Sequence, residues 1–421
     1  MKYGMYTIDD FNVKGKTILC RIDINQPIDQ KTGRLKDTTR IMGCIPTIRE
    51  LSEKGAKVVL LAHQGGDLEY KNYYTTRPHA EVISNTLGKT IYFIDDVTGL
   101  AARDKIRNLR EGEILLLDNV RFMAEEMTLF ETKMNLSHEQ QSLTQVVKKL
   151  APLGDLFICD AFSAAHRSQP TLVGFEQVLP SAMGRLFEEE FDVITSIMED
   201  PKRPCIFVLG GAKIQDAFMM MNTLLEKGTT DFVLTGGLVA NIMLVANGID
   251  IGRPSMDFIE NNNLSEFIHV AENIIRSYSD KVLIPSDLAY TDNGRHEIGS
   301  GYLPVDRLLT DIGHDTVGLY VNYIEKAGTI FVNGPMGVFE NEVSEYGTRS
   351  IWNAVADSCA YSVLGGGDSI AAINKYKLEK KISYICTGGG ALVRFLSGEE
   401  LPVVKALRYA AQKFGPVISE R

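Results

Sequence analysis

Short, nearly continuous apolar runs alternate with stretches of helical period along the whole chain. In the first half the runs are TILCRID, VVLLAHQG, ILLLDNVRF and LFICDAF, and in the second half CIFVLGGAK, DFVLTGG, VLIPSD, TIFVNGP, YSVLGGGD and YICTGGG. Strands with consecutive apolar residues are buried on both faces, which is typical of parallel sheets covered by helices. The pattern predicts an α/β fold with doubly wound, mainly parallel sheets.

The chain has 421 residues, which is too long for one compact core, so we expect two domains. Residues 181–200, which follow Pro180, carry apolar side chains at helical spacing and predict a helix that joins the domains. The expected divisions are an N-terminal domain over residues 1–178, a joining helix over 179–200, a C-terminal domain over 201–400 and a tail over 401–421.

The residues that follow the strands differ between the two halves. In the first half five of these residues are basic: Arg21, His63, Arg121, His166 and Arg167. A further basic residue, Arg40, lies in the polar segment after the first strand. Ligands of parallel sheets bind beyond the carboxyl ends of the strands, and the guanidinium fork matches phosphate and carboxylate oxygens. These residues predict a site for a small anion, although scattered surface charge is the alternative. Asp23 and Asn25 could bind a hydroxyl of the same ligand, or form a turn before Pro27.

In the second half the strands end in glycines: Gly210–Gly211, Gly236–Gly237, Gly365–Gly367 and Gly388–Gly390. Glycine-rich turns that open a helix expose backbone N–H groups, which favour phosphate. Asp368 directly follows one such turn and could reach a magnesium ion on the phosphates of a nucleotide; its alternative role is a helix N-cap. Lys213 could neutralise a transferring phosphoryl group, or be an ordinary surface lysine.

Several classes of protein are disfavoured. The Walker A loop is absent, and no GxGxxG follows a strand. The net charge of -10 repels nucleic acid and acidic membranes. The six cysteines show neither a CxxC pair nor metal-ligand spacing, which favours the reducing cytoplasm. Residues 232–249 are uncharged, but their glycines and asparagines indicate a strand, a turn and a short buried helix rather than a membrane span.

The motifs DAFSAAHRSQP, LGGAKIQD, VNGPMGVFE, LGGGDS and CTGGGA, in this order after RIDINQP, resemble those of phosphoglycerate kinases over nearly the whole chain. RIDINQP, AHQG and HRSQP resemble the archaeal branch. The resemblance implies two Rossmann-like domains that bend about a hinge, with the C-terminal tail returning to the N-terminal domain. It also implies reversible phosphoryl transfer between 1,3-bisphosphoglycerate with MgADP and 3-phosphoglycerate with MgATP. A monomer is expected, and a homodimer is left open.

The resemblance also implies roles for single residues. The residues implied to bind the acid substrate, 3-phosphoglycerate, are Asp23, Asn25, Arg40, His63, Arg121, His166 and Arg167. For the nucleotide the resemblance implies Lys213 at the phosphates, Gly236, Gly237 and Gly313 at adenine, Asn333 at phosphate, Glu340 at ribose, and Gly365, Gly366, Gly367, Asp368 and Ser369 at the phosphates and Mg²⁺. We expect in-line transfer with Arg40 and Lys213 on opposite sides of the transferring group. Backbone N–H groups near Gly366 and Gly389 would complete the cradle.

Three positions depart from the family pattern. Ala217 stands where a second lysine is common, Gly66 where many members have arginine, and Asp118 where glutamate is usual. The first two leave open how charge is balanced at each site. The alternative is a non-catalytic phosphometabolite- or nucleotide-binding protein on the same scaffold, which loss of Arg40 and Lys213 would favour, although both are present. A dehydrogenase and a structural protein rank behind it.

Overall fold

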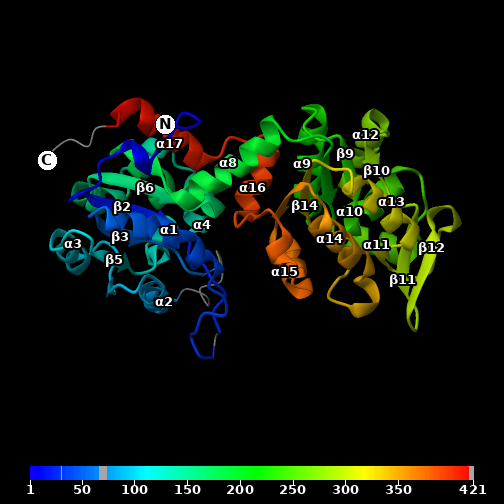
Figure 1. Cartoon of the computed structure of the whole chain (residues 1–421), viewed down its shortest axis with the longest axis horizontal. Coiled ribbons are helices and arrows are strands. Elements are labelled where there is room, and N and C mark those ends of the chain that lie inside the picture. The colour runs from blue at the N-terminus through cyan, green and yellow to red at the C-terminus, as the bar shows by residue number, and fades with distance from the viewer. Residues whose placement is uncertain (30, 66–73, 417–421) are drawn as a thin grey trace. The chain divides into compact units, whose positions relative to one another are not determined.

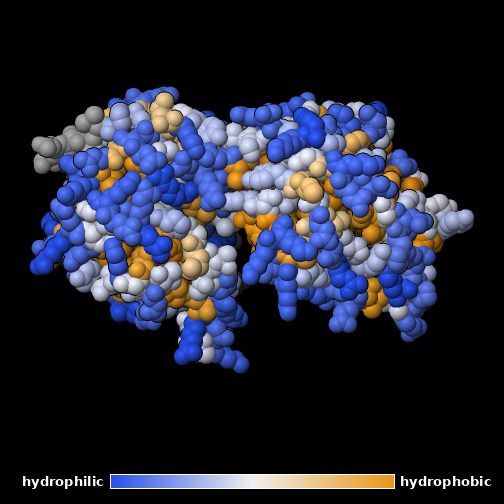
Figure 2. Space-filling view, in the orientation of Figure 1, coloured by the Kyte–Doolittle hydropathy of each residue, from blue (hydrophilic) through white to orange (hydrophobic). Residues whose placement is uncertain are grey.

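The computed structural model describes residues 1–29, 31–65 and 74–416. The chain forms two compact units, Met1–Asp192 with Glu400–Arg421, and Val193–Glu399 (Figure 1). We call them the first and the second unit. Figure 2 shows that hydrophilic residues dominate the visible surface of both units, with apolar residues interspersed.

The first unit is built on a parallel sheet of seven strands. Their spatial order is β1 (Tyr6–Thr7), β7 (Ser181–Met183), β6 (Leu156–Asp160), β2 (Thr17–Ile22), β3 (Lys57–Leu61), β5 (Ile114–Leu117) and β4 (Ile91–Ile94). All residues of β2, β5, β6 and β7 are buried, as is expected for a sheet covered on both faces. The carboxyl ends of β2, β3, β5 and β6 therefore meet at one edge.

Helices surround this sheet: α1 (Thr39–Glu53), α2 (Arg77–Leu87), α3 (Leu100–Arg107), α4 (Thr128–Met134), α5 (His138–Gln141), α6 (Gln145–Leu150) and α7 (Pro170–Val173). The last helix of the chain, α17 (Pro402–Phe414), belongs to the same unit. The Val403 N–H donates to the Ala165 carbonyl at 3.3 Å, and Lys413 Nζ donates to the Gln177 carbonyl at 2.9 Å. These bonds attach α17 to the segments that follow β6.

Helix α8 (Arg185–Glu199) begins later than the sequence predicts, because Ser181–Met183 forms strand β7 between β6 and β1. Side chains from other elements accept the first N–H groups of the helix. Thr47 Oγ1 accepts from the Arg185 N–H at 2.7 Å, and Asp160 Oδ1 accepts from the Phe187 N–H at 3.1 Å. The start of α8 is therefore fixed by residues far away in the sequence.

The second unit contains a parallel sheet of six strands. Their order is β10 (Val282–Leu283), β9 (Phe232–Thr235), β8 (Cys205–Leu209), β14 (Thr329–Asn333), β15 (Tyr361–Gly365) and β16 (Tyr384–Ile385). A smaller antiparallel sheet places β11 (Asp287–Thr291) between β12 (Arg295–Gly299) and β13 (Leu309–Ile312). The helices are α9 (Ile214–Glu226), α10 (Gly237–Ala246), α11 (Arg253–Asn261), α12 (Glu266–Tyr278), α13 (His314–Ile324), α14 (Tyr346–Asp357), α15 (Gly367–Tyr376) and α16 (Gly389–Leu396).

The two parallel sheets confirm the predicted fold class, and each of the ten apolar runs contains a strand. The uncharged stretch forms β9 and the short buried helix α10, as predicted. None of the helices in the described parts of the chain is long and apolar enough to cross a membrane. All six cysteines are free, and only Cys359 is exposed.

Candidate active site

Asp23 is the centre of a polar cluster at the carboxyl edge of the first sheet. It follows β2 directly and is 3% exposed. Its Oδ2 accepts hydrogen bonds from Arg40 Nη1 and from Ser163 Oγ, and its Oδ1 accepts from the Asn25 N–H at 3.0 Å. Burial alone would raise the pKa of Asp23, but the charge of Arg40 and the hydrogen bonds from Ser163 and the Asn25 N–H lower it to about 2. Asp23 is therefore ionised and accepts a hydrogen bond from Arg40, which lies in the first turn of α1.

His63, which lies just beyond the end of β3, is buried against the guanidinium of Arg21. Arg21 Nη2 lies 2.9 Å from His63 Nδ1, and Arg21 Nε donates to Thr171 Oγ1 at 3.0 Å. A guanidinium has no acceptor, so Nδ1 must accept and the neutral ring carries its proton on Nε2. Burial and the charge of Arg21 lower the pKa of His63 well below its ordinary value. His63 therefore offers an N–H donor rather than a positive charge.

The backbone around Gly65 connects Asn25 with Arg121. Asn25 Oδ1 accepts from the Gly65 N–H at 2.9 Å, and Arg121 Nη1 donates to the Gly65 carbonyl. Arg121 lies in the short helical turn after β5 and is 3% exposed. Asn25 and Arg121, two residues of the predicted anion site, are thus held by the backbone of one residue after β3.

Arg167 and His166 follow the turn Phe162–Ala164 after β6, and both are half-buried. Arg167 Nη1 donates to Thr128 Oγ1 at 2.7 Å at the start of α4. The charge of Arg167 also acts on His63 and Arg21, which places it in the same cluster. The structure therefore brings together Asp23, Asn25, Arg40, His63, Arg121 and Arg167, with His166 adjacent in the chain.

In the second unit, the ends of β8, β9 and β14 approach one another so closely that they require glycine. The Gly211 N–H donates to the Pro335 carbonyl at 2.8 Å, and the Gly237 N–H donates to the Met336 carbonyl at 2.7 Å. Gly237 has a φ of +54°, and a Cβ built there would lie 2.8 Å from the Gly211 nitrogen. These glycines therefore serve close backbone packing at the mouth of the sheet.

Next to these glycines is a small recess lined by residues from the ends of β8, β14 and β15: Gly210, Gly211, Ala212, Lys213, Asn333, Gly334, Gly366, Asp368 and Ser369. Lys213 and Asp368 are exposed, and neither side chain makes a hydrogen bond or ion pair with a described residue. Asp368 lies in the first turn of α15 without accepting a capping bond, so it does not serve as the N-cap of that helix. Gly366, at φ +87°, is the N-cap residue instead.

The N-terminus of α15 lies at this recess. Ser369 Oγ accepts from the Gly334 N–H at 2.7 Å, and this bond joins the first turn of α15 to the end of β14. A Cβ at Gly366 would meet Asn333 Oδ1 at 2.3 Å, and a Cβ at Gly389 would lie 3.9 Å from the Gly366 Cα. The N-termini of α15 and α16 thus lie beside each other, and such termini favour anions.

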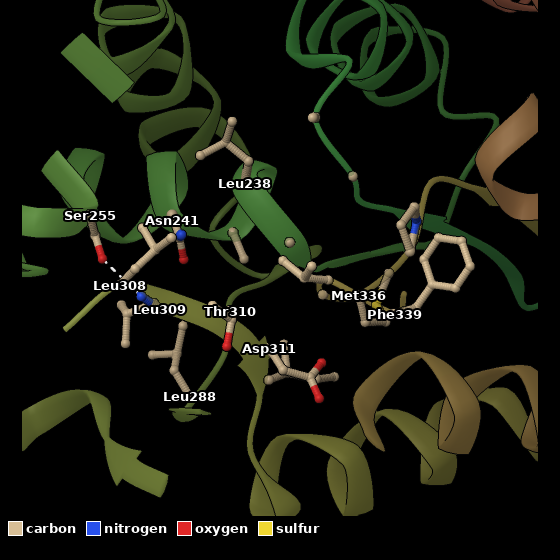
Figure 3. A pocket seen from close by; sticks show the side chains of 18 of the residues that line it. Leu238, Asn241, Ser255, Leu288, Leu308, Leu309, Thr310, Asp311, Met336 and Phe339 are labelled. Atoms are coloured by element: carbon tan, nitrogen blue, oxygen red, sulfur yellow. Dashed lines mark hydrogen bonds between the residues drawn. The ribbon is translucent and has the colours of Figure 1, made fainter. Parts of the chain in front are cut away.

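A larger cavity of about 260 Å³ adjoins the recess and shares Gly211, Ala212 and Asp368 with it. It is mostly apolar, and Figure 3 shows Leu238, Leu288, Leu308, Leu309 and Met336 around it. Of the residues predicted at adenine and ribose, Gly237 and Glu340 line this cavity, whereas Gly236 and Gly313 lie outside its lining. An apolar cavity beside a phosphate-binding mouth can hold the base and sugar of a nucleotide.

The structure describes two of the three positions that depart from the family pattern, and both are buried. Ala217 is buried on α9 at 2% exposure. Asp118 is buried and accepts from the Thr76 N–H at 2.8 Å, so it fixes the start of α2. Gly66 lies outside the described residues.

Sequence reasoning missed the supports of the acid cluster. Ser163 and Thr171 contact it from positions 140 and 150 residues away from their partners. Glu126 accepts from the Thr171 N–H at 2.7 Å and from the Thr171 hydroxyl at 2.8 Å, and burial raises its pKa to about 7. Among these supporting residues, only Arg21 could be noticed from the sequence, because it is a cation inside a strand-like run.

No group of three or more His, Cys, Asp or Glu side chains among residues 1–29, 31–65 and 74–416 could hold a metal ion. One carboxylate, Asp368, lies at the recess predicted for phosphates. This agrees with the way Mg²⁺ is usually held, through one or two carboxylates together with substrate phosphates.

Residues 8–399 match the family model described as phosphoglycerate kinase. The chain is 44% identical to the phosphoglycerate kinase of Methanobacterium bryantii, over 98% of this chain and 99% of that protein. It is 40% identical to the crystal structure of the kinase from Pyrococcus horikoshii OT3, with a TM-score of 0.87 over 97% and 100% of the two chains. The kinase structure from Coxiella burnetii is 29% identical, with a TM-score of 0.80 over 96% and 98%. The archaeal relatives agree with the predicted branch, and the chain belongs to the phosphoglycerate kinase family.

Proposed function

We propose that the phosphoglycerate kinase activity of this chain uses the acid cluster of the first unit for 3-phosphoglycerate and the recess and cavity of the second unit for MgATP. The reaction is the reversible transfer of a phosphoryl group between 1,3-bisphosphoglycerate with MgADP and 3-phosphoglycerate with MgATP. The observation that carries the proposal is the pairing of Arg40 with the ionised Asp23 in a cluster of further cations.

In the first unit, the proposed roles follow from protonation. Ionised Asp23 can accept only, and one of its lone pairs remains for the hydroxyl of the acid. Neutral His63 donates through Nε2, while the guanidinium groups of Arg121 and Arg167 supply positive charge for the phosphate. His166 completes this set as a further donor, and Asn25 assists Asp23 at the hydroxyl.

Arg40 has a different proposed role. Its side chain is 36% exposed although its Nη1 is bound to Asp23, so the rest of its guanidinium remains available to a ligand. We propose that it stabilises the charge that develops on the transferring group, as arginine does in other phosphoryl transfers.

In the second unit, we propose that Lys213 contacts the phosphates of the nucleotide and that the N–H groups near Gly366 and Gly389 donate to them. Asn333, Gly365, Gly367 and Ser369 shape the same recess. Asp368 would hold Mg²⁺, which would neutralise part of the phosphate charge when bound. The cavity would take adenine beside Gly236, Gly237 and Gly313, and the ribose near Glu340.

Transfer requires both ligands within bonding distance, so the proposal includes a step that brings the two units together. Helices α8 and α17 contain the expected hinge parts. We also propose that the chain is a monomer and that it works in the cytoplasm; its six free thiols support the cytoplasmic location.

The test is a coupled assay with 3-phosphoglycerate and MgATP on the native chain and on Arg40→Ala. We expect turnover to fall about a thousand-fold or more, with the dissociation constant of MgADP unchanged. Arg49→Ala is the matched control, because Arg49 is exposed on the same helix and its side chain makes no hydrogen bond or ion pair with a described residue. Near-normal turnover of Arg40→Ala would remove the role of Arg40, and ligand binding by the native chain without ATP-dependent turnover would support the non-catalytic alternative.

A further inference from the structure

The cavity of the second unit has two distinct ends. Gly211 and Asp368 belong both to the cavity and to the phosphate recess, so they mark the phosphate end. Asn241, Ser255 and Leu308 line another part of the cavity, outside the recess, and lie together in Figure 3. If the proposed function holds, the base of the nucleotide occupies that second end.

Asn241 is unusual among the buried polar side chains that line the cavity. It lies on α10, is 6% exposed, and its amide makes no hydrogen bond with any residue that the structure describes. Its amide atoms nevertheless retain some accessible surface, which the cavity provides. Buried amides in proteins are nearly always hydrogen-bonded, so this one indicates a partner that enters the cavity.

The other buried polar side chains of the lining already have partners. Ser255 Oγ accepts from the Leu309 N–H at 3.0 Å. Asp311 Oδ2 accepts from Arg295 Nη1 at 2.8 Å. Thr310, which is half-buried, shares a hydrogen bond of 2.8 Å with Ser344. The Ser255 hydroxyl keeps its proton to donate, and Asp311 Oδ1 has no partner among the described residues. Asn241 differs from both, because its amide makes none of its hydrogen bonds within the described residues and offers a donor and an acceptor side by side.

The two groups of the Asn241 amide match one edge of adenine. That edge presents the N6 amino group as a donor beside N7 as an acceptor, and an amide can satisfy both at once. The same edge of guanine presents O6 and N7, which are both acceptors, so an amide can satisfy only one of them. We propose that Asn241 recognises the N6 and N7 edge of adenine and makes this kinase selective for adenine over guanine nucleotides.

The test measures binding by calorimetry without 3-phosphoglycerate, so that it does not depend on turnover. We expect the native chain to bind MgADP about ten-fold more tightly than MgGDP or the magnesium complex of 7-deaza-ADP, which lacks the N7 acceptor. In Asn241→Leu, which keeps a similar volume without the amide, binding of MgADP should weaken about ten-fold and the three affinities should become nearly equal.

Leu238→Ala is the matched control, since Leu238 lies on the same helix and lines the same cavity. It should weaken MgADP and MgGDP by the same factor. A native preference for MgADP below two-fold, or an equal loss of both nucleotides in Asn241→Leu, would overturn the role of Asn241. The comparison with 7-deaza-ADP needs no substitution and holds if a variant fails to fold. Absence of any nucleotide binding by the native chain would instead overturn the proposed function, and this inference with it.

Discussion

Asp160 provides a sharp test of the electrostatics inside the first unit. It ends β6 and is fully buried, and its Oδ1 accepts from the Phe187 N–H while its Oδ2 has no partner among the described residues. Burial raises the pKa of Asp160 to about 7, and the nearby Glu190 adds to the effect. The carboxyl is therefore protonated in the folded chain at pH values where the unfolded chain has lost the proton. Asp160→Asn mimics the protonated form at all pH values.

The sign follows from linkage. Between the ordinary pKa of 3.8 and the folded pKa of about 7, the folded chain binds more protons, so its stability falls as the pH rises through this interval. The difference corresponds to an upper bound of about 4 kcal/mol at about 1.4 kcal/mol for each pKa unit. We expect Asp160→Asn to match the native chain within about 0.5 kcal/mol at pH 4 and to exceed its stability by about 2–4 kcal/mol at pH 8.

Hydrogen exchange of the β6 and α8 amides measures this locally at both pH values. The single tryptophan, Trp352, lies in the second unit, so the urea midpoint of its fluorescence serves as an internal reference. Asp104→Asn is the control substitution, because Asp104 forms only an exposed pair with Arg107 and should change stability by less than about 1 kcal/mol. A stability difference between Asp160→Asn and the native chain that is the same at pH 4 and pH 8 would refute the reasoning.

Two further substitutions test the supports of the ligand sites. Arg21→Lys cannot reproduce the fork that holds His63, so we expect the pKa of His63 to rise, ¹⁵N NMR of its ring to show a mixture of tautomers, and the KM for 3-phosphoglycerate to increase about ten-fold; an unchanged ring spectrum would contradict this. Lys375 Nζ donates to the Phe339 carbonyl at 2.7 Å and thereby holds the loop that carries Glu340. Lys375→Met should raise the KM for MgATP several-fold with kcat nearly unchanged, whereas the exposed Lys380→Met should alter neither, and equal kinetics of the two variants would exclude this tether.

The parallel strands could be predicted because their signal is local, since each is a run of buried apolar residues. The antiparallel sheet gave no such signal. Strand β12 carries Arg295, His296 and Glu297 and is mostly exposed or half-buried, so it contains no apolar run. Ser181–Met183 was predicted as helix but pairs as a strand with β6 and β1, and long-range pairing of this kind is absent from the local pattern.

The candidate site divides in the same way. Cations and glycines that follow strands could be found from the sequence, because the carboxyl ends of parallel strands share one edge. Their protonation and their partners could not. The buried Arg21 and the partly exposed Arg40 are both arginines near the same strand, and only the fold shows that Arg21 holds His63 whereas Arg40 pairs with Asp23. The free amide of Asn241 also has no local signal, because its environment is assembled from α10, α11 and the antiparallel sheet.

The two proposed ligand sites differ in whether their charged side chains are hydrogen-bonded to other protein groups. In the first unit, Arg40, Arg121 and Arg167 each donate to a protein acceptor, so their side chains are already held before an anion arrives. In the second unit, Lys213 and Asp368 are exposed and make no such bond with a described residue. A held guanidinium loses little side-chain entropy when it binds, whereas an unheld lysine must be ordered by the ligand. If the proposed sites hold, selectivity for the acid is therefore built into the first unit, whereas the phosphate recess should become ordered only when a nucleotide binds.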